Sequence, residues 1–169
     1  MSLIRTARGF TPKIHTSVFV AESANIIGDV EIGENSSVWY QTVIRGDVMP
    51  IRIGTSTNIQ DGSIIHGTYG KYGTTLGSEV TIGHQVVLHG TTVSDRCLIG
   101  MGSILMDGSF IAKNCIVGAG SLVTEGFRCE EEGWLVLGRP AKAVRKLKTE
   151  ELNFLKQSAD NYRLYTTWY

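Results

Sequence analysis

The sequence is poor in proline, cysteine and net charge, and it has no long apolar run. Its 169 residues include 3 prolines and 3 cysteines, and 16 basic side chains balance 16 acidic ones. A chain without excess positive charge lacks the electrostatic surface typical of proteins that bind nucleic acids or anionic membranes. No stretch of about 18 apolar residues occurs, and residues 1–13 lack the apolar core of a signal peptide. We therefore expect one domain with no nucleic-acid or membrane partner.

The three cysteines follow no spacing typical of a zinc knuckle or a disulfide framework. We therefore expect a reducing, cytoplasmic setting. Glycine, in contrast, is abundant, with 20 residues spread along the chain. Such a distribution indicates tight turns at regular intervals, which makes an internal repeat the first feature to seek.

An aliphatic residue recurs every six residues along most of the chain. The period slips by three residues at Val48–Pro50, is interrupted by an insert at Gly67–Thr75, and loses one residue at Thr91–Thr92. The fourth residue after most of these anchors is small or short. The 18 anchors are Ile14, Val20, Ile26, Ile32, Val38, Ile44, Ile53, Ile59, Ile65, Leu76, Ile82, Leu88, Val93, Ile99, Leu105, Ile111, Val117 and Val123.

A period of six fits neither an α-helix nor an ordinary β-strand. Six-residue units are the signature of a parallel β-helix, in which each unit supplies one short strand and one turn. Three units close a triangular coil, so the anchors predict about six coils, and at ~4.8 Å per coil the prism is roughly 30 Å tall. We expect this all-β fold over residues 14–128, after an N-terminal segment at 1–13.

The remaining chain, residues 129–169, leaves the repeat. A short strand is expected at Trp134–Gly138. Thr149 is expected to cap an α-helix with two glutamates in its first turn, where carboxylates suit the helix dipole. Apolar residues at helical spacing from Leu152 to Tyr162 predict that this helix packs along a face of the prism.

The repeat also predicts where the cysteines lie. Cys97 and Cys115 are 18 residues apart, and each is the fourth residue after an anchor. We expect them to stack in one inward column as small buried side chains rather than to act in redox chemistry. Cys129 is expected to lie beyond the last coil.

Three of the four histidines lie in the middle of the chain. His66 and His89 each follow an anchor of the same corner, Ile65 and Leu88. They are 23 residues apart, and the extra length of the insert accounts for five of these, which leaves one coil. The two side chains are therefore expected to be stacked neighbours that point the same way. This spacing suits two ligands of one metal ion, with nitrogens about 2.0–2.1 Å from it.

His84 is the second residue after Ile82, an anchor on another corner of the triangle. It lies about a third of a turn away from the other two histidines, so a site with three histidines needs His84 from another subunit. A closed threefold trimer brings these two corners together. The pattern therefore predicts a homotrimer with a metal at each interface. Three histidines with one open position are typical of catalytic zinc.

Short motifs surround the histidines: Val43–Asp47, Asn58–Gly62, Ile65–His66 and Ile82–Gly90, with Ile99–Ser103 and Ser158–Tyr162 extending the set. Together they resemble the γ-class carbonic anhydrases and their close bacterial relatives, which are trimeric left-handed β-helix proteins. The resemblance covers nearly the whole chain. It implies the left hand of the coil, a zinc cofactor (with iron as the alternative) and reversible hydration of CO2 to bicarbonate.

The resemblance also implies roles for individual residues. His66, His84 and His89 would be the metal ligands. Gln60 would hydrogen-bond the hydroxide formed on the metal, and Asn58 would orient Gln60. These roles depend on the histidines, because Gln60 alone carries no functional signal.

Three charged residues, Arg45, Asp47 and Asp61, would form ionic contacts between subunits beside the metal. The chain departs from the founding archaeal enzyme of the family in two places. Val48 stands where that enzyme has a glutamate, and the insert has no carboxylate to carry protons. Tyr162 is the nearest polar replacement, although a core tyrosine is an equal interpretation. Because proton export is weakened, we expect low activity.

Two other functions remain open. The repeat and the segment Gly138–Lys142 resemble CoA-dependent hexapeptide acyltransferases, which use one catalytic histidine as a base and need no trio. A metal-binding member of the γ-carbonic anhydrase family with weak or no catalysis is the other alternative. Metal content without CO2 hydration would favour the latter.

Overall fold

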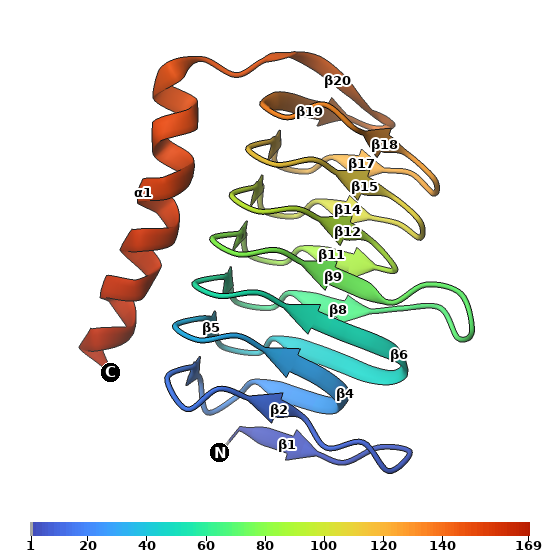
Figure 1. The fold of residues 1–169 in the computed structure, drawn as a ribbon, viewed down its shortest axis with the longest axis vertical. Coiled ribbons are helices and arrows are strands. Elements are labelled where there is room, and N and C mark those ends of the chain that lie inside the picture. The colour runs from blue at the N-terminus through green and yellow to red at the C-terminus, as the bar shows by residue number, and fades with distance from the viewer. Residues whose placement is uncertain (1) are drawn as a thin grey trace.

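A computed structural model describes residues 2–169, most of which wind into a stack of short parallel strands (Figure 1). The strands belong to two sheets. One has twelve strands: β1 (Leu3–Arg5), β2 (Lys13–Ile14), β4 (Asn25–Ile32), β6 (Val43–Ile53), β8 (Ile64–His66), β9 (Thr74–Leu76), β11 (Val87–His89), β12 (Thr92–Val93), β14 (Ile104–Leu105), β15 (Phe110–Ile111), β17 (Leu122–Val123) and β18 (Arg128–Cys129). The other has eight: β3 (Phe19–Val20), β5 (Ser37–Val38), β7 (Asn58–Ile59), β10 (Thr81–Ile82), β13 (Leu98–Ile99), β16 (Ile116–Val117), β19 (Trp134–Gly138) and β20 (Ala141–Lys146).

The strand register confirms three columns of anchors. In the first column, Ile44 pairs with Ile65 and Ile65 pairs with Leu88. In the second, Ile59 pairs with Ile82. The third column runs through β2, the second half of β4 and of β6, and then β9, β12 and β15. Because β6 pairs with β8 through its first half and with β9 through its second, the larger sheet folds around a corner of the prism.

The anchors fill the core of the prism. Sixteen of the 18 are buried, and the two exceptions, Ile14 and Val20, lie in the first full coil. Each buried aliphatic side chain contributes about 1.5–3 kcal/mol relative to its exposure. Short polar side chains at the turns are also buried, and their hydroxyls donate to the next coil: Ser63 Oγ, for example, lies 2.9 Å from the Gly83 carbonyl oxygen. These bonds offset the cost of burying the hydroxyls. Because they join successive coils, they also fix the position of each corner residue along the axis of the prism.

The stack has about seven turns, one more than expected, because strands at both ends join it. β1 pairs with β4, and β18 and β19 pair with β15 and β16. Cys129 pairs with Ile111 and is buried, so the prediction that it lies beyond the coils is wrong. The burial of Cys97 and Cys115 is confirmed. Burial also raises the pKa of the Cys97 thiol, which keeps it protonated and unreactive.

The C-terminal helix α1 (Thr149–Tyr165) starts at the predicted place but with a different cap. Its N-cap is Lys148, and Thr149 is already helical, so the predicted cap is wrong by one residue. The Glu151 carboxylate accepts a hydrogen bond from the Lys148 backbone N–H at 2.7 Å. The cap therefore comes from a side chain within the helix.

Helix α1 stands beside the coils on the side of the smaller sheet and continues into a 3-10 turn, η1 (Thr166–Trp168) (Figure 1). The helix residues Leu155 and Ala159 are buried against the coils, as the apolar spacing predicts. Leu152, on the same predicted face, is 40% exposed, so the packed face begins later than predicted. The Ser158 hydroxyl lies 3.0 Å from the Thr81 hydroxyl on β10, which joins the helix to the coils. Within residues 2–169, no helix combines the length and the apolar character that a membrane span needs.

Candidate metal centre

His66 and His89 lie side by side at the ends of β8 and β11. The two strands pair these residues directly, one coil apart, as the length of the insert predicts. His66 Nδ1 lies 3.3 Å from His89 Nε2. Two nitrogen ligands at about 2.0–2.1 Å from a tetrahedral zinc ion lie about 3.3–3.4 Å apart. The facing nitrogens therefore have the spacing of two ligands of one ion.

A carboxylate holds the far nitrogen of each ring. Asp47 Oδ1 lies 2.9 Å from His66 Nε2, and Asp107 Oδ1 lies 2.7 Å from His89 Nδ1. An ionised carboxylate only accepts hydrogen bonds, so each neutral ring carries its proton on the far nitrogen. The two facing nitrogens then keep lone pairs. Carboxylates in this second position are typical of metal-binding histidines, because they fix the tautomer and the ring orientation.

Both carboxylates are stabilised in their ionised form. Burial works against ionisation of Asp47, but hydrogen bonds from His66 and Arg45 outweigh it and lower the pKa of Asp47. Burial likewise opposes ionisation of Asp107, and hydrogen bonds from Thr68 and His89 lower its pKa overall. Arg45 pairs with Asp47 of its own chain, one coil before His66.

Asp107 is a site residue that the sequence analysis missed. It follows His89 by 18 residues, which is the length of one uninterrupted coil. The coil that joins the two residues is one residue shorter, because Leu88 pairs with Leu105, so Asp107 lies one residue beyond the position level with His89. Counting from the anchors therefore does not pair Asp107 with His89. Asp107 is the second residue after Leu105, whereas His89 directly follows Leu88.

His84 lies apart from the other two histidines, after β10 on the smaller sheet. Its Nδ1 lies 2.8 Å from Asp61 Oδ2, and both side chains are about half exposed. No group of three or more His, Cys, Asp and Glu side chains in residues 2–169 converges on one metal position. Within one chain, the predicted ligand set is therefore split between two corners.

A buried polar chain starts at Gln60, next to Asp61. Gln60 Nε2 donates to Asn58 Oδ1 at 3.1 Å, and Asn58 Nδ2 donates to Thr81 Oγ1 at 3.0 Å. Thr81 in turn contacts Ser158 of helix α1. Asn58 thus fixes the Gln60 amide through its nitrogen end. Helix α1 therefore supports the position of Gln60 through Ser158, Thr81 and Asn58.

Comparison with known proteins places the chain in a family. No family model matches it. The chain is 49% identical over 166 residues to Protein YrdA of Escherichia coli K12, across 95% of this chain and 90% of that one. It is 47% identical over 156 residues to Gamma carbonic anhydrase 1, mitochondrial, of Arabidopsis thaliana, across 89% of this chain and 56% of that one. It is 44% identical over 160 residues to Carbonic anhydrase of Geobacillus kaustophilus, across 95% and 87% of the two chains. The chain belongs to the γ-carbonic anhydrase family.

Solved structures agree on the fold of this γ-carbonic anhydrase family member. A hexapeptide transferase family protein from Anaplasma phagocytophilum matches with a TM-score of 0.94 at 41% identity, over 99% of this chain and 98% of that one. A putative acetyltransferase from Bacillus cereus matches with a TM-score of 0.95 at 40% identity, over 99% and 96%. The coil is thus the left-handed β-helix of hexapeptide proteins, as the resemblance implies.

Tyr162 and His84 face the same hollow on the surface of the chain. Both line a depression of about 250 Å³ together with Asp61. The Tyr162 ring packs against Trp39 and Tyr165, with centroids 5.6 and 5.2 Å away. Burial, and then the nearby Asp61 and Tyr165, raise the pKa of Tyr162 to about 12. Near neutral pH the phenol is therefore protonated and can donate a hydrogen bond.

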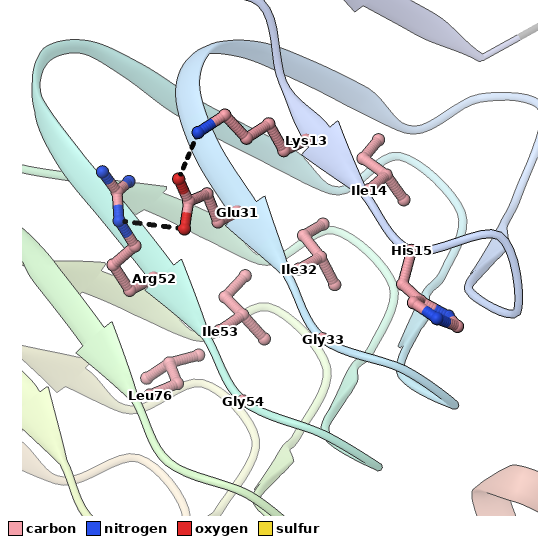
Figure 2. A pocket seen from close by; sticks show the side chains of 10 residues that line it. All are labelled: Lys13, Ile14, His15, Glu31, Ile32, Gly33, Arg52, Ile53, Gly54 and Leu76. Carbon is pink, nitrogen blue, oxygen red and sulfur yellow. Dashed lines mark hydrogen bonds and ion pairs between the residues drawn. The ribbon is translucent and has the colours of Figure 1, made fainter.

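Another depression, of about 650 Å³, lies on the third anchor column, away from the three histidines (Figure 2). Its rim carries a ladder of charges in which Glu31 lies 3.0 Å from Lys13 and 3.6 Å from Arg52. Arg52 also pairs with Asp29 at 2.8 Å. The two basic and two acidic side chains of this ladder compensate one another.

Proposed function

We propose that the protein catalyses the reversible hydration of CO2 to bicarbonate at a metal ion, with zinc as the metal and iron as the alternative. The observation that carries the proposal is the pair of facing nitrogens of His66 and His89. These nitrogens keep lone pairs, lie 3.3 Å apart and are backed by carboxylates on the far side of each ring. Relatives named carbonic anhydrase at 44–49% identity support the choice of reaction.

The complete site requires a second subunit in this proposal. His66 and His89 of one subunit and His84 of its neighbour would hold the metal, in a homotrimer with three equivalent sites. The split of the histidines between two corners of one chain supports this arrangement. Arg45, Asp47 and Asp61, which lie at the same two corners, would supply ionic contacts across each interface.

Bound zinc lowers the pKa of a coordinated water to about 7 and so supplies a nucleophile near neutral pH. The protein's own residues would then orient the reactants. Asp47 and Asp107 hold the rings of His66 and His89 in the tautomer that a metal requires. Gln60, held by Asn58, offers a polar group after β7, the strand that pairs with β10 shortly before His84.

Each turnover must also release a proton, and the chain has little to carry it. Val48 lies in a depression of about 300 Å³ beside Asp47 and Tyr69, and the insert has no carboxylate. We therefore propose that turnover is slow and depends on buffer as the proton acceptor.

The proposal is tested by metal analysis and a CO2 hydration assay on one sample purified without air. Wild-type protein should contain about one metal per chain and hydrate CO2. His66→Ala should lose both properties because it removes a ligand, whereas His15→Ala, far from the site, should retain both. A metal-loaded protein that does not hydrate CO2 would show the catalytically inactive alternative to be correct.

The acyltransferase alternative is tested separately by calorimetric titration with CoA. The name of the Bacillus cereus relative, a putative acetyltransferase, motivates this control. We expect no saturable binding of CoA. Binding that is accompanied by acyl transfer and abolished by His89→Ala would replace the proposed function.

A further inference from the structure

The carboxylate behind His89 has a second partner, in the insert. The Asp107 Oδ1 atom accepts from His89 Nδ1 at 2.7 Å, and Asp107 Oδ2 accepts from the Thr68 hydroxyl. The Asp107 side chain is only 21% exposed. One carboxylate therefore joins a candidate metal ligand to a segment that the proposed mechanism does not use.

The insert is itself held firmly over this carboxylate. Thr68 and Tyr72 exchange two backbone hydrogen bonds of 2.9 and 3.1 Å, which close the insert into a small loop. The Tyr72 side chain rests on two glycines: a Cβ at Gly90 would lie 2.7 Å from Tyr72 Cβ, and a Cβ at Gly108 would lie 3.3 Å from its ring. A Cβ at Gly90 would also overlap the Asp107 carboxylate. Glycine at these positions lets the insert approach Asp107.

The end of the insert ties the two histidine strands together. The Thr74 hydroxyl donates to the His66 carbonyl oxygen at 2.6 Å and accepts from the Gly90 N–H at 3.0 Å. The insert thus spans β8 and β11 just beyond their histidines. A displacement of the insert would therefore move the backbone next to both histidines.

We propose that Asp107 is a positioning residue of the metal centre and that the insert holds Asp107 in place through Thr68. The inference rests on the proposed metal-binding function. With its proton on Nδ1, His89 keeps the Nε2 lone pair that faces His66. Without Asp107, the neutral ring is free to adopt the other tautomer, which places a proton on Nε2, and to rotate. Removal of such a partner typically weakens metal binding by about 10–100-fold.

The test measures zinc affinity by competition with a chromophoric chelator, on the assembled protein. Asp107→Ala should weaken zinc binding by about 10–100-fold. Thr68→Val keeps the shape of the side chain and removes one hydrogen bond, so it should weaken binding by about two- to tenfold. Thr75→Val makes the same change at an exposed position of β9 and should leave the affinity unchanged. Circular dichroism verifies the fold of each variant.

A second measurement does not depend on the metal. In metal-free protein with 15N-labelled histidine, the NMR spectrum should show His89 protonated at Nδ1, and Asp107→Asn should reduce this tautomer. Zinc affinity within about twofold of wild type in both Asp107→Asn and Thr68→Val would overturn the inference, even if Asp107→Ala fails to fold. Wild-type protein that binds no metal would overturn the proposed function instead. In that case, a population of the Nδ1 tautomer that Asp107→Asn leaves unchanged would also overturn the positioning role.

Discussion

At the scale of single residues, the Tyr162 hydroxyl sits where its protonated form is favoured. The ring is half-buried against Trp39 and Tyr165, and the Asp61 carboxylate lies nearby. With a pKa of about 12, the phenol cannot take up a proton near neutral pH, because it already holds one. The structure therefore favours a packing role for Tyr162 over that of a proton acceptor.

Tyr162→Phe should accordingly leave the kcat of CO2 hydration within about twofold of wild type between about pH 6 and pH 9. A phenol whose pKa is raised to about 12 releases its proton only well above this range, so its removal changes no titrating group within it. Stopped-flow assays at low and high buffer concentration measure the effect, with Tyr165→Phe as the matched variant. A tenfold loss that added imidazole buffer restores would instead identify Tyr162 as a proton carrier.

The contacts of single residues are also where sequence reasoning reached its limit. The pairing of His66 with His89 follows from counting residues, because the repeat fixes which positions share a corner. The bond between His89 and Asp107 depends on how a side chain reaches between coils, and spacing alone does not determine that. The cap of helix α1 is also set by a side-chain contact, because the Glu151 carboxylate inside the helix accepts from the Lys148 N–H. Residue type at the start of the helix does not reveal this contact.

At the scale of elements, helix α1 is joined to β20 by one forked ion pair. Arg145 Nη1 and Nη2 donate to the two carboxylate oxygens of Glu151 at 2.8 and 2.7 Å. The hydrogen bonds from Arg145, and then from the Lys148 backbone, lower the pKa of Glu151 to about 2. Because this value lies below the ordinary 4.5, the ionised carboxylate stabilises the folded helix above about pH 4.5, and that stabilisation is lost as the pH falls toward 2.

Glu151→Gln should therefore lower the Tm near pH 7, and the difference from wild type should shrink as the pH falls from about 4.5 to about 2. Thermal melts followed by circular dichroism at several pH values measure this. Glu150→Gln removes a carboxylate from the same turn outside the fork and serves as the control. A difference in Tm that stays constant down to pH 2 would contradict the role of the fork.

The coils were predictable as elements because their signal is local and repeated. Every six residues an aliphatic side chain enters the core, and the register of the strands follows from that spacing. The last coil was missed although Cys129 keeps the interval of six after Val123, because its anchor is a thiol. Val136 then follows after seven residues, and the period is broken.

At the scale of the whole molecule, His84 follows a strand of the smaller sheet, whereas His66 and His89 lie in the larger one, and this separation makes assembly testable. Light scattering of metal-loaded protein should give about 55 kDa, three times the 18.5 kDa of one chain. A monomer mass at micromolar concentration would contradict a site shared between subunits.

Mixed trimers provide a sharper test of which subunit supplies His84. His84→Ala and His66→Ala should each bind no metal alone. After the two variants are unfolded together and refolded in equal amounts, about a quarter of the interfaces should join an intact His66–His89 pair to an intact His84. Metal analysis should recover that fraction, and recovery of none would assign His84 to its own chain's site.

The antiparallel strand β20 has a consequence for the shape that the molecule can take. A stack of parallel strands ends in unpaired backbone groups, onto which another copy could add coil after coil. β20 crosses the final coil in the opposite direction to β19, packs on β17 and carries Lys142, Arg145 and Lys146. A strand that continued the parallel stack would meet an antiparallel strand with three basic side chains there. β20 thereby gives the molecule an end at which the parallel coil does not continue.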